Sequence, residues 1–133
     1  MASGLSTAER NRYLTVNYKT ATIYGALCDA DPTDAAVMSG KEIAAGTDYA
    51  RTEITCGDDS TTGSIANTAA LEFLPANGGD WGTIGWLAIC TTDVEDADTV
   101  IASGSLTVSK LIEDGDQLVF AIGAVTVAIA VQA

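Results

Sequence analysis

The sequence predicts an all-β fold: a single-domain antiparallel β-sandwich, jelly-roll-like, with a short N-terminal helix or arm. Its 133 residues suit one domain by length. Roughly seven short strand-like runs follow one another at about ten-residue spacing, as they do in sandwiches. Apolar residues make up 47% of the chain, yet it has only two Phe, two Trp and four Tyr. A core built from such small side chains is typical of sheets packed face to face.

The N-terminal segment, residues 1–19, is expected to form the helix or arm, and residues 20–133 the β-sandwich domain. Ser6 and Glu9 have the spacing of a capping box that begins a helix. The helix is expected to reach about Tyr18, although β-branched residues weaken its last turn. It either covers an open end of a sheet or grips a neighbouring molecule, and the sequence leaves both roles open.

The stretch 46–89 organises the rest of the chain. Residues 49–56 alternate, so that Ile54 and Cys56 share one face while Arg51 lies on the other. A polar turn follows. A second alternating run is then stopped by a loop rich in proline and glycine.

The same alternation predicts six further strands within and beyond this stretch, and the last two are expected to pair with each other. They span residues 20–28, 64–73, 83–91, 99–109, 117–122 and 124–131. The run 83–91 is apolar on both faces, which places it in the middle of the protein. We expect the inner rows of the sandwich to include Ile54, Leu71, Phe73, Leu87, Ile89, Val119, Val125 and Val127.

The charge balance excludes two classes of partner. The chain carries 18 acids and six bases, a formal charge of −12, and no histidine. A nucleic-acid binder needs the opposite sign, and an anionic membrane would repel this surface. We therefore expect no nucleic acid and no membrane as partner, and a bias towards basic patches on other proteins.

Targeting signals and cysteine usage indicate synthesis in a reducing cytosol. The N-terminus lacks the apolar region of a signal peptide, and the longest apolar run, 121–131, is too short to span a bilayer. Cys28, Cys56 and Cys90 lie far apart in sequence and form no metal or redox pair. We expect all three to be small buried hydrophobes without a disulfide.

The residue types needed for catalysis are missing or unpaired. Without histidine there is no base for a Ser-His-Asp or Cys-His arrangement and no imidazole ligand for zinc. The glycine-rich turns lack the lysine of a phosphate loop. No pair among the 18 acids is singled out for glycoside cleavage. We expect no catalytic residues, no cofactor and no enzymatic activity.

Two acidic clusters could supply oxygen ligands for Ca²⁺. One contains Asp29, Asp31 and Asp34, and the other spans residues 93–98. Neither has the spaced loop and terminal Glu of an EF-hand. We interpret both as solvated turns and expect no metal.

Each of the two tryptophans could be either a core residue or an exposed binding residue. Trp86 is expected in the core, because the chain is short of large residues. Trp81, beside Gly79 and Asp80, is either a core residue or, with Tyr49, part of an exposed platform for sugars. If it is buried, its indole N–H should find a carbonyl.

Several motifs in register resemble a family of small tailed-bacteriophage virion proteins, usually described as tail-fibre or minor tail proteins. They are YAR at 49–51, NTA at 67–69, PA at 75–76 and DWGT at 80–83. The strand and turn ATIYGALCDADPTDA upstream and IASGSLTVSKLIEDGDQLVFAIGAVTV downstream are similar to the family as well. Where that family usually has TH after DWGT, this chain has Ile84 and Gly85.

The resemblance implies a non-enzymatic structural protein on the surface of a virion assembled in the host cytoplasm. Two positions compete. Our first expectation is a capsid decoration or cement protein that binds the major capsid protein, because a fibre needs repeats or a coiled coil for its shaft and this sequence has neither. The alternatives are a tail-fibre or minor tail protein, which binds tail proteins, and a carbohydrate-binding module for host recognition.

The contacts to other virion proteins are expected from the N-terminal segment and an exposed strand edge, in a homo-oligomer or on the capsid lattice. Arginines would pair with acids of the partner, and apolar side chains would act as anchors. The candidate partner-binding residues are Leu5, Arg10, Arg12, Leu14, Tyr18 and Trp81.

Overall fold

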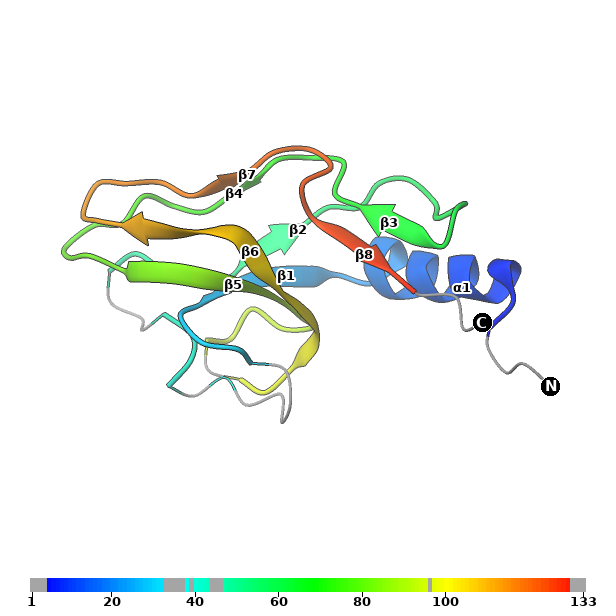
Figure 1. Cartoon of the computed structure of the whole chain (residues 1–133), viewed down its shortest axis with the longest axis horizontal. Helices are drawn as coiled ribbons and strands as arrows, with labels where there is room; N and C mark the ends of the chain where they lie inside the picture. The colour runs from blue at the N-terminus through cyan, green and yellow to red at the C-terminus, as the bar shows by residue number, and fades with distance from the viewer. Residues whose placement is uncertain (1–4, 33–37, 39, 44–46, 96, 130–133) are drawn as a thin grey trace.

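The computed structural model describes residues 5–32, 38, 40–43, 47–95 and 97–129. In these parts the protein is all-β and antiparallel, with one short helix near its N-terminus (Figure 1). The elements are α1 (Thr7–Leu14), the π-type turn η1 (Thr15–Thr20), β1 (Ile23–Cys28), β2 (Thr52–Ile54), β3 (Ser64–Ala66), β4 (Leu71–Glu72), β5 (Gly82–Cys90), β6 (Val100–Ile112), β7 (Val119–Phe120) and β8 (Thr126–Ala128). The fold class predicted from the sequence is confirmed.

The main sheet has four antiparallel strands in the order β2-β1-β5-β6. β5 lies inside it, and its side chains are buried on both sides: Leu87 and Ile89 belong to the larger core, Ala88 and Cys90 to a smaller one. A second layer of strands covers the first face, and Met38 packs on the other. This double cover explains why β5 has no polar face, and the expected central position is confirmed.

The second layer is a long antiparallel ribbon made of two short pairs, β3 with β8 and β4 with β7. Ser64 lies opposite Ala128, and further along the ribbon Leu71 lies opposite Phe120. Figure 1 shows both pairs along the same side of β5 and β6. The last two strands therefore do not pair with each other, as the sequence suggested, but each with an earlier strand.

A single buried side chain, that of Asn67, bridges the interruption in this ribbon. Its Nδ2 donates to the carbonyls of Ala69 and Ala121 at 2.8 and 3.0 Å, and its Oδ1 accepts from the Val125 N–H at 2.9 Å. Its backbone N–H donates to the Val125 carbonyl, and its carbonyl accepts from the Gly123 N–H. The amide thus supplies the hydrogen bonds that the ladder lacks here, and the residue is only 1% exposed.

The expected inner rows are confirmed except at one position. The buried members are Ile54, Leu71, Phe73, Leu87, Ile89 and Val125, and Val127 is partly buried against them. Val119 is 45% exposed, so its assignment to the core was wrong. The register gives the reason: Phe120 faces Leu71 across the ribbon and turns inward onto Phe73, which leaves Val119, opposite Glu72, on the outside.

The N-terminal helix begins where the capping box predicts, with the Ser6 hydroxyl accepting from the Glu9 N–H at 3.1 Å. The Glu9 carboxylate does not turn back to the cap but binds Arg12. On the inner side, Leu14 and Tyr18 are 0% and 4% exposed and belong to the larger core. The helix therefore packs on the strands of the same chain.

The smaller core lies on the other face of the main sheet and contains two of the three cysteines. Ala26, Cys28, Met38, Ala88 and Cys90 are all fully buried there. All three cysteines of the chain are free and buried, as expected. Burial is the main cause that raises the pKa of Cys28 to about 12 and of Cys90 to about 11.

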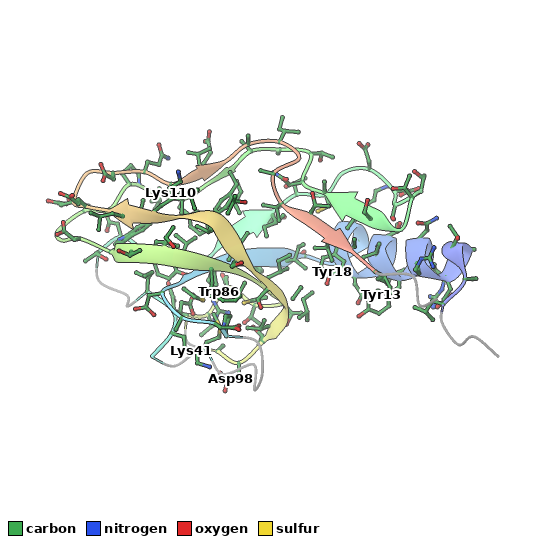
Figure 2. All side chains as sticks on the ribbon, in the orientation of Figure 1. Tyr13, Tyr18, Lys41, Trp86, Asp98 and Lys110 are labelled. Atoms are coloured by element: carbon green, nitrogen blue, oxygen red, sulfur yellow. The ribbon has the colours of Figure 1, made fainter. Side chains whose placement is uncertain are left out.

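Trp86 lies beside this smaller core and is partly buried against it. Figure 2 shows its side chain on the side of the main sheet away from the ribbon, towards Lys41 and Asp98. The expectation that Trp86 is a core residue is met in part, because the residue is only partly buried.

Replacing Asn67 should destabilise the protein strongly. Asn67→Ala leaves a buried N–H and two carbonyls without partners, at a cost of about 2–4 kcal/mol in the free energy of unfolding. Asn77→Ala is the matched control, since Asn77 is exposed and its amide donates only to the exposed Asp48; we expect a change within about 0.5 kcal/mol. Urea titrations measure both, and equal losses would contradict the bridging role.

The buried thiols predict a loss of stability at alkaline pH. An unfolded cysteine ionises near 9.0, whereas the folded chain keeps Cys28 and Cys90 protonated up to about 12 and 11. Between these values the unfolded state binds fewer protons, so the free energy of unfolding falls as the pH rises, by about 1 kcal/mol per thiol at pH 10. Urea titrations with reductant at pH 7.5 and 10 measure it. The variant Cys28→Ala/Cys90→Ala should show a flatter slope, and an unchanged slope would refute the assignment.

Candidate functional site

Among the ion pairs of the described residues, the pair between Arg51 and Glu42 is the one that is fully buried. Both side chains are 0% exposed. The Arg51 Nε donates to Glu42 Oε2 at 2.9 Å and its Nη2 to Oε1 at 2.8 Å, a two-pronged contact that fits the planar guanidinium. The sequence pattern placed Arg51 on the face opposite Ile54 and Cys56, which is the solvent side of a half-buried strand. The exposure expected for that side is wrong here, because Arg51 is only 5% exposed beneath the loop that carries Thr92 and Ala97.

The covering segments are bound by the same guanidinium. Its Nη1 donates to the Thr92 carbonyl at 3.1 Å and to the Thr99 Oγ1 at 3.3 Å, and its Nη2 donates to the Ala97 carbonyl at 3.0 Å. Arg51 therefore ties the loop between β5 and β6 to the segment of Glu42. With its donors occupied inside the protein, it offers nothing to a ligand.

Tyr49 extends the cluster into the aromatic core. Its hydroxyl donates to the Glu42 carboxylate and accepts from the Leu27 N–H at 3.1 Å. Burial, followed by the nearby carboxylate, raises the pKa of the Tyr49 phenol well above its usual range. The ring stacks on Phe73 at 6.5 Å between centroids and meets Trp81 edge-on at 5.6 Å.

Trp81 is part of this core and not of a surface. It is 7% exposed, and its indole N–H donates to the Thr47 carbonyl at 3.0 Å. Tyr49 is 4% exposed. The prediction of a carbohydrate platform from these two rings is thereby overturned, as is the expectation that Trp81 reaches a partner from the surface of the folded chain.

The described residues offer no built site for a metal. No group of three or more Cys, Asp and Glu side chains comes together among them in a way that could hold an ion. Asp34 and Asp96, which complete the two acidic clusters of the sequence, lie outside the described residues. Within the same described part, no helix is long and apolar enough to cross a membrane.

The predicted partner-binding residues of the N-terminal segment fall into two groups. Leu14 and Tyr18 are buried in the chain's own core and are not free to anchor a neighbour. Leu5 is 47% exposed, and Arg12 is exposed but paired with Glu9. Arg10 folds back along the helix, where its Nη1 and Nη2 donate to the Leu5 carbonyl and the Thr7 hydroxyl, both at 3.1 Å.

The outer side of the helix nevertheless carries apolar side chains that the sequence did not single out. Tyr13 and Val16 are each 47% exposed. They stand three residues apart, so they lie on the same side of the helix. We call Tyr13 and Val16 the helix patch; Leu5, also 47% exposed, precedes the helix.

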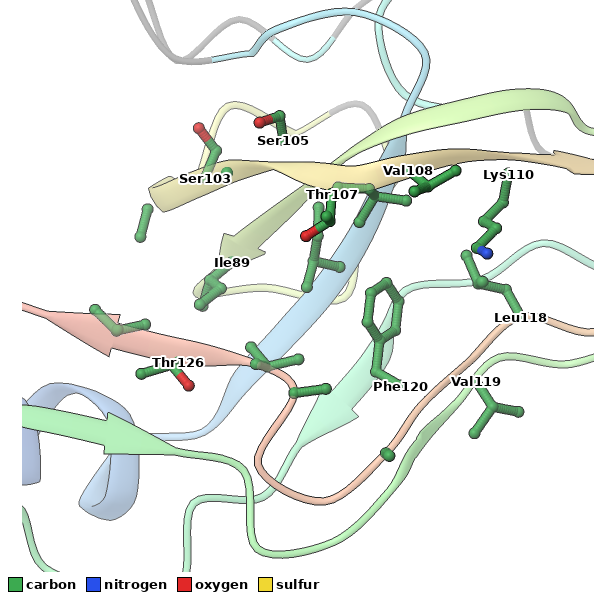
Figure 3. A pocket seen from close by; sticks show the side chains of 18 of the residues that line it. Ile89, Ser103, Ser105, Thr107, Val108, Lys110, Leu118, Val119, Phe120 and Thr126 are labelled. Atoms are coloured by element: carbon green, nitrogen blue, oxygen red, sulfur yellow. The ribbon is translucent and has the colours of Figure 1, made fainter.

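A groove of about 660 Å³ opens between the main sheet and the ribbon (Figure 3). Leu87 and Ile89 of β5 line it from the main sheet, with residues 102–108 and Lys110 of β6. Residues 118–121 and 124–128 line the opposite wall. Figure 3 shows Phe120 between the two walls, pointing from the ribbon towards β6.

The groove lies where the two layers of the sandwich are not joined by strand pairing. β6 ends the main sheet, and neither β7 nor β8 pairs with it, so two strands face each other without a shared ladder. Apart from Lys110, the lining side chains are apolar or small and polar. Such a surface can accept a polypeptide, but it has no titratable pair for acid–base chemistry.

Comparison with known families decides the class of the protein. A family model described as Podophage GP4 fiber I protein gp80 matches residues 6–128, nearly the whole chain. The chain belongs to this phage fibre family. The resemblance to tailed-phage virion proteins seen in the sequence is thus supported, and the association with other virion proteins follows from the family. No curated protein matches the chain.

Membership of the fibre family favours a fibre over the capsid decoration that we expected first. Four residues of the motifs that carried the sequence resemblance are buried: Tyr49 and Arg51 of YAR, Asn67 of NTA and Trp81 of DWGT. Each of the four takes part in hydrogen bonds within the fold and is not free to bind a partner.

Breaking the ion pair should cost far more than breaking a surface pair. Arg51→Met leaves the Glu42 carboxylate buried without its cation, and we expect a loss of about 3–5 kcal/mol in the free energy of unfolding. The double variant Arg51→Met/Glu42→Leu should recover part of that loss, because no unpaired charge remains. Lys19→Met, which removes the exposed pair with Asp59, is the control and should cost less than about 1 kcal/mol. Additive losses in the double variant would contradict a coupled pair.

Proposed function

We propose that this protein is a non-enzymatic structural subunit of a tail fibre in a podophage virion. The observation that carries the proposal is the match of residues 6–128 to the fibre I family. The structure is compatible with it, because the charged and aromatic clusters of the described residues are buried and hydrogen-bonded within the fold.

The subunit acts by binding other virion proteins. Its described surface offers two apolar regions for this purpose, the helix patch and the groove beside β6. The helix patch lies near Arg12, as the sequence analysis anticipated for an N-terminal contact, but with Tyr13 and Val16 as its anchors in place of Leu14 and Tyr18. We assign this patch to the attachment of the subunit to a neighbouring tail protein.

Capsid decoration remains the second candidate on one observation. The sequence contains no repeats and no heptads from which a fibre shaft is built. A compact domain of this kind also suits a lattice of capsid proteins. The two candidates place the protein on different parts of the particle, so its location separates them.

Labelling of intact particles tests the location. Antibody fragments against the purified chain, visualised by electron cryomicroscopy, should mark the tail and its fibres. Labels spread over the head would support decoration and refute the fibre proposal. Fitting the two-layer domain into a reconstruction of the particle provides an independent check of the same point.

Substitution of the helix patch tests the attachment. Tyr13→Glu/Val16→Glu adds charge to exposed positions, so the fold should persist while incorporation into particles falls about tenfold or more. Leu74→Glu is the matched control, since Leu74 is another exposed large apolar residue, 59% exposed, far from the patch in sequence. Incorporation is measured by quantitative immunoblots of purified particles and folding by thermal unfolding. Normal occupancy of the double variant would refute the assignment. Deleting residues 1–19 is less informative, because it also removes Leu14 and Tyr18 from the core.

A further inference from the structure

Two turns lie at the end of the domain away from the helix, and each contains a chemically labile pair of residues (Figure 1). One pair is Asn77-Gly78, between β4 and β5, and the other is Asp114-Gly115, between β6 and β7. All four residues are exposed. Asparagine is among the thermolabile residues of proteins. It is most labile before glycine, because a residue without a side chain leaves its backbone nitrogen open to attack the preceding side chain.

The reaction at such a pair is a cyclisation. The backbone nitrogen of Gly78 loses its proton and forms a bond to Cγ of Asn77. The bond from Cγ to Nδ2 breaks, and Nδ2 takes up a proton and leaves as ammonia. Water then opens the five-membered imide at one of its two carbonyls. The product is aspartate, or isoaspartate when the backbone continues through the former side chain, and water is the only reagent consumed.

In the folded chain a carboxylate binds the nitrogen that would attack. The Gly78 N–H donates to Asp114 Oδ1 at 3.1 Å, and Nδ2 of Asn77 donates to Asp48 Oδ2 at 3.0 Å. Hydrogen bonds to a charged acceptor are stronger than those between neutral groups. The first bond must break before the nitrogen can react, and the second restrains the rotation that brings Cγ to it. A carboxylate beside the N–H also opposes loss of the proton, since two negative charges would then be adjacent.

The two labile pairs restrain each other. The Gly115 N–H, which would attack the Asp114 side chain in the same way, donates to the Ala76 carbonyl at 2.7 Å. The Ala76 N–H in turn donates to the Asp116 carbonyl at 2.9 Å. Asp114 itself is positioned by its backbone N–H, which donates to Asp80 Oδ1 at 2.7 Å. The carboxylate of one labile pair therefore occupies the reactive nitrogen of the other.

We propose that Asn77 is a site of spontaneous modification, converted by the Gly78 nitrogen to aspartate and isoaspartate at a rate that the Asp114 carboxylate controls. Loop tips open locally more often than the core does. Each opening releases the Gly78 N–H from Asp114, and cyclisation then competes with reclosure. The contact between the two turns thus sets how long a chain keeps its original residue.

Conversion of Asn77 changes this end of the domain irreversibly. A carboxylate at position 77 replaces the amide that donates to Asp48, so an attraction becomes a repulsion between like charges. Isoaspartate also adds one carbon to the backbone. The Asn77 N–H donates to the Thr47 carbonyl, which also accepts from the indole of Trp81. We therefore expect modified chains to hold Trp81 less firmly and to unfold at lower urea concentrations.

Ageing of the purified full chain tests the proposal. One sample is kept folded and a second is unfolded in guanidinium chloride, both in mildly alkaline buffer with reductant. Peptide mass spectrometry measures conversion at position 77, and an isoaspartyl methyltransferase counts isoaspartate independently. Position 77 should convert in the unfolded chain, and the folded chain should convert at about a tenth of that rate or less. Asn77→Gln should show no comparable conversion, because its longer side chain cyclises far more slowly.

Two substitutions in one turn separate the role of the Asp114 carboxylate from a general loss of charge. Asp114→Ala removes the acceptor of the Gly78 N–H, and conversion in the folded chain should rise about threefold or more. Asp116→Ala is the matched control, because it removes the same charge but its side chain accepts from the Glu113 N–H. Hydrogen exchange at the Gly78 N–H should accelerate in the first variant and not in the second. Thermal unfolding checks that both variants fold.

Conversion at position 77 that is slow in the folded wild type, and faster in Asp114→Ala than in Asp116→Ala, supports the proposal. Equal rates in the folded and unfolded wild type would overturn it, as would an unfolded chain that stays intact at position 77 or equal acceleration in the two variants. If Asp114→Ala does not fold, exchange at the Gly78 N–H of the wild type decides. Protection supports the restraint, and exchange as fast as in the unfolded chain refutes it. None of these results depends on the place of the protein in the virion.

Discussion

The buried pair of Glu42 and Arg51 is the interaction that holds the loop between β5 and β6 against the main sheet. It joins three segments that no ladder connects completely: the segment of Glu42, the start of β2 and the loop between β5 and β6. Tyr49 links the same carboxylate to β1 and to the aromatic core. Because a charge that is buried without its partner is costly, separating any one of these segments from the others would destabilise the fold.

Asn67 plays the corresponding part at the other layer. The ribbon over the main sheet consists of two short pairs, and strands this short cannot hold a register by their ladders alone. The buried amide fixes the register across the break by binding both chains of the ribbon. Two polar clusters thus specify how the layers meet, in a core that is otherwise made of small apolar side chains.

The use of these polar residues inside the fold determines which residues remain on the surface. Tyr49, Arg51, Asn67 and Trp81, which stand out in the sequence, are buried inside the fold, so they do not mark a binding site. The exposed surfaces that could bind partners have few charged groups. They are the β6 edge, which carries no acid, the groove lined by small and apolar residues, and the helix with exposed Tyr13 and Val16. For the fibre role that we propose, contacts of this kind are sufficient, because assembly depends on buried area and complementary charge.

By itself the sequence determined the fold class, the start of the helix, the central position of β5 and most of the inner rows, because period-two alternation and turn residues act locally. It also determined the resemblance to phage proteins. Only the tertiary structure decided the rest. Arg51 reads as an outer residue of an alternating strand until a distant loop covers it, and Glu42 lies in a stretch without any periodicity. Val119 was misplaced because a register depends on the partner strand. The open groove beside β6 depends on which strands remain unpaired, and pairing across the chain leaves no local signal in the residues that take part.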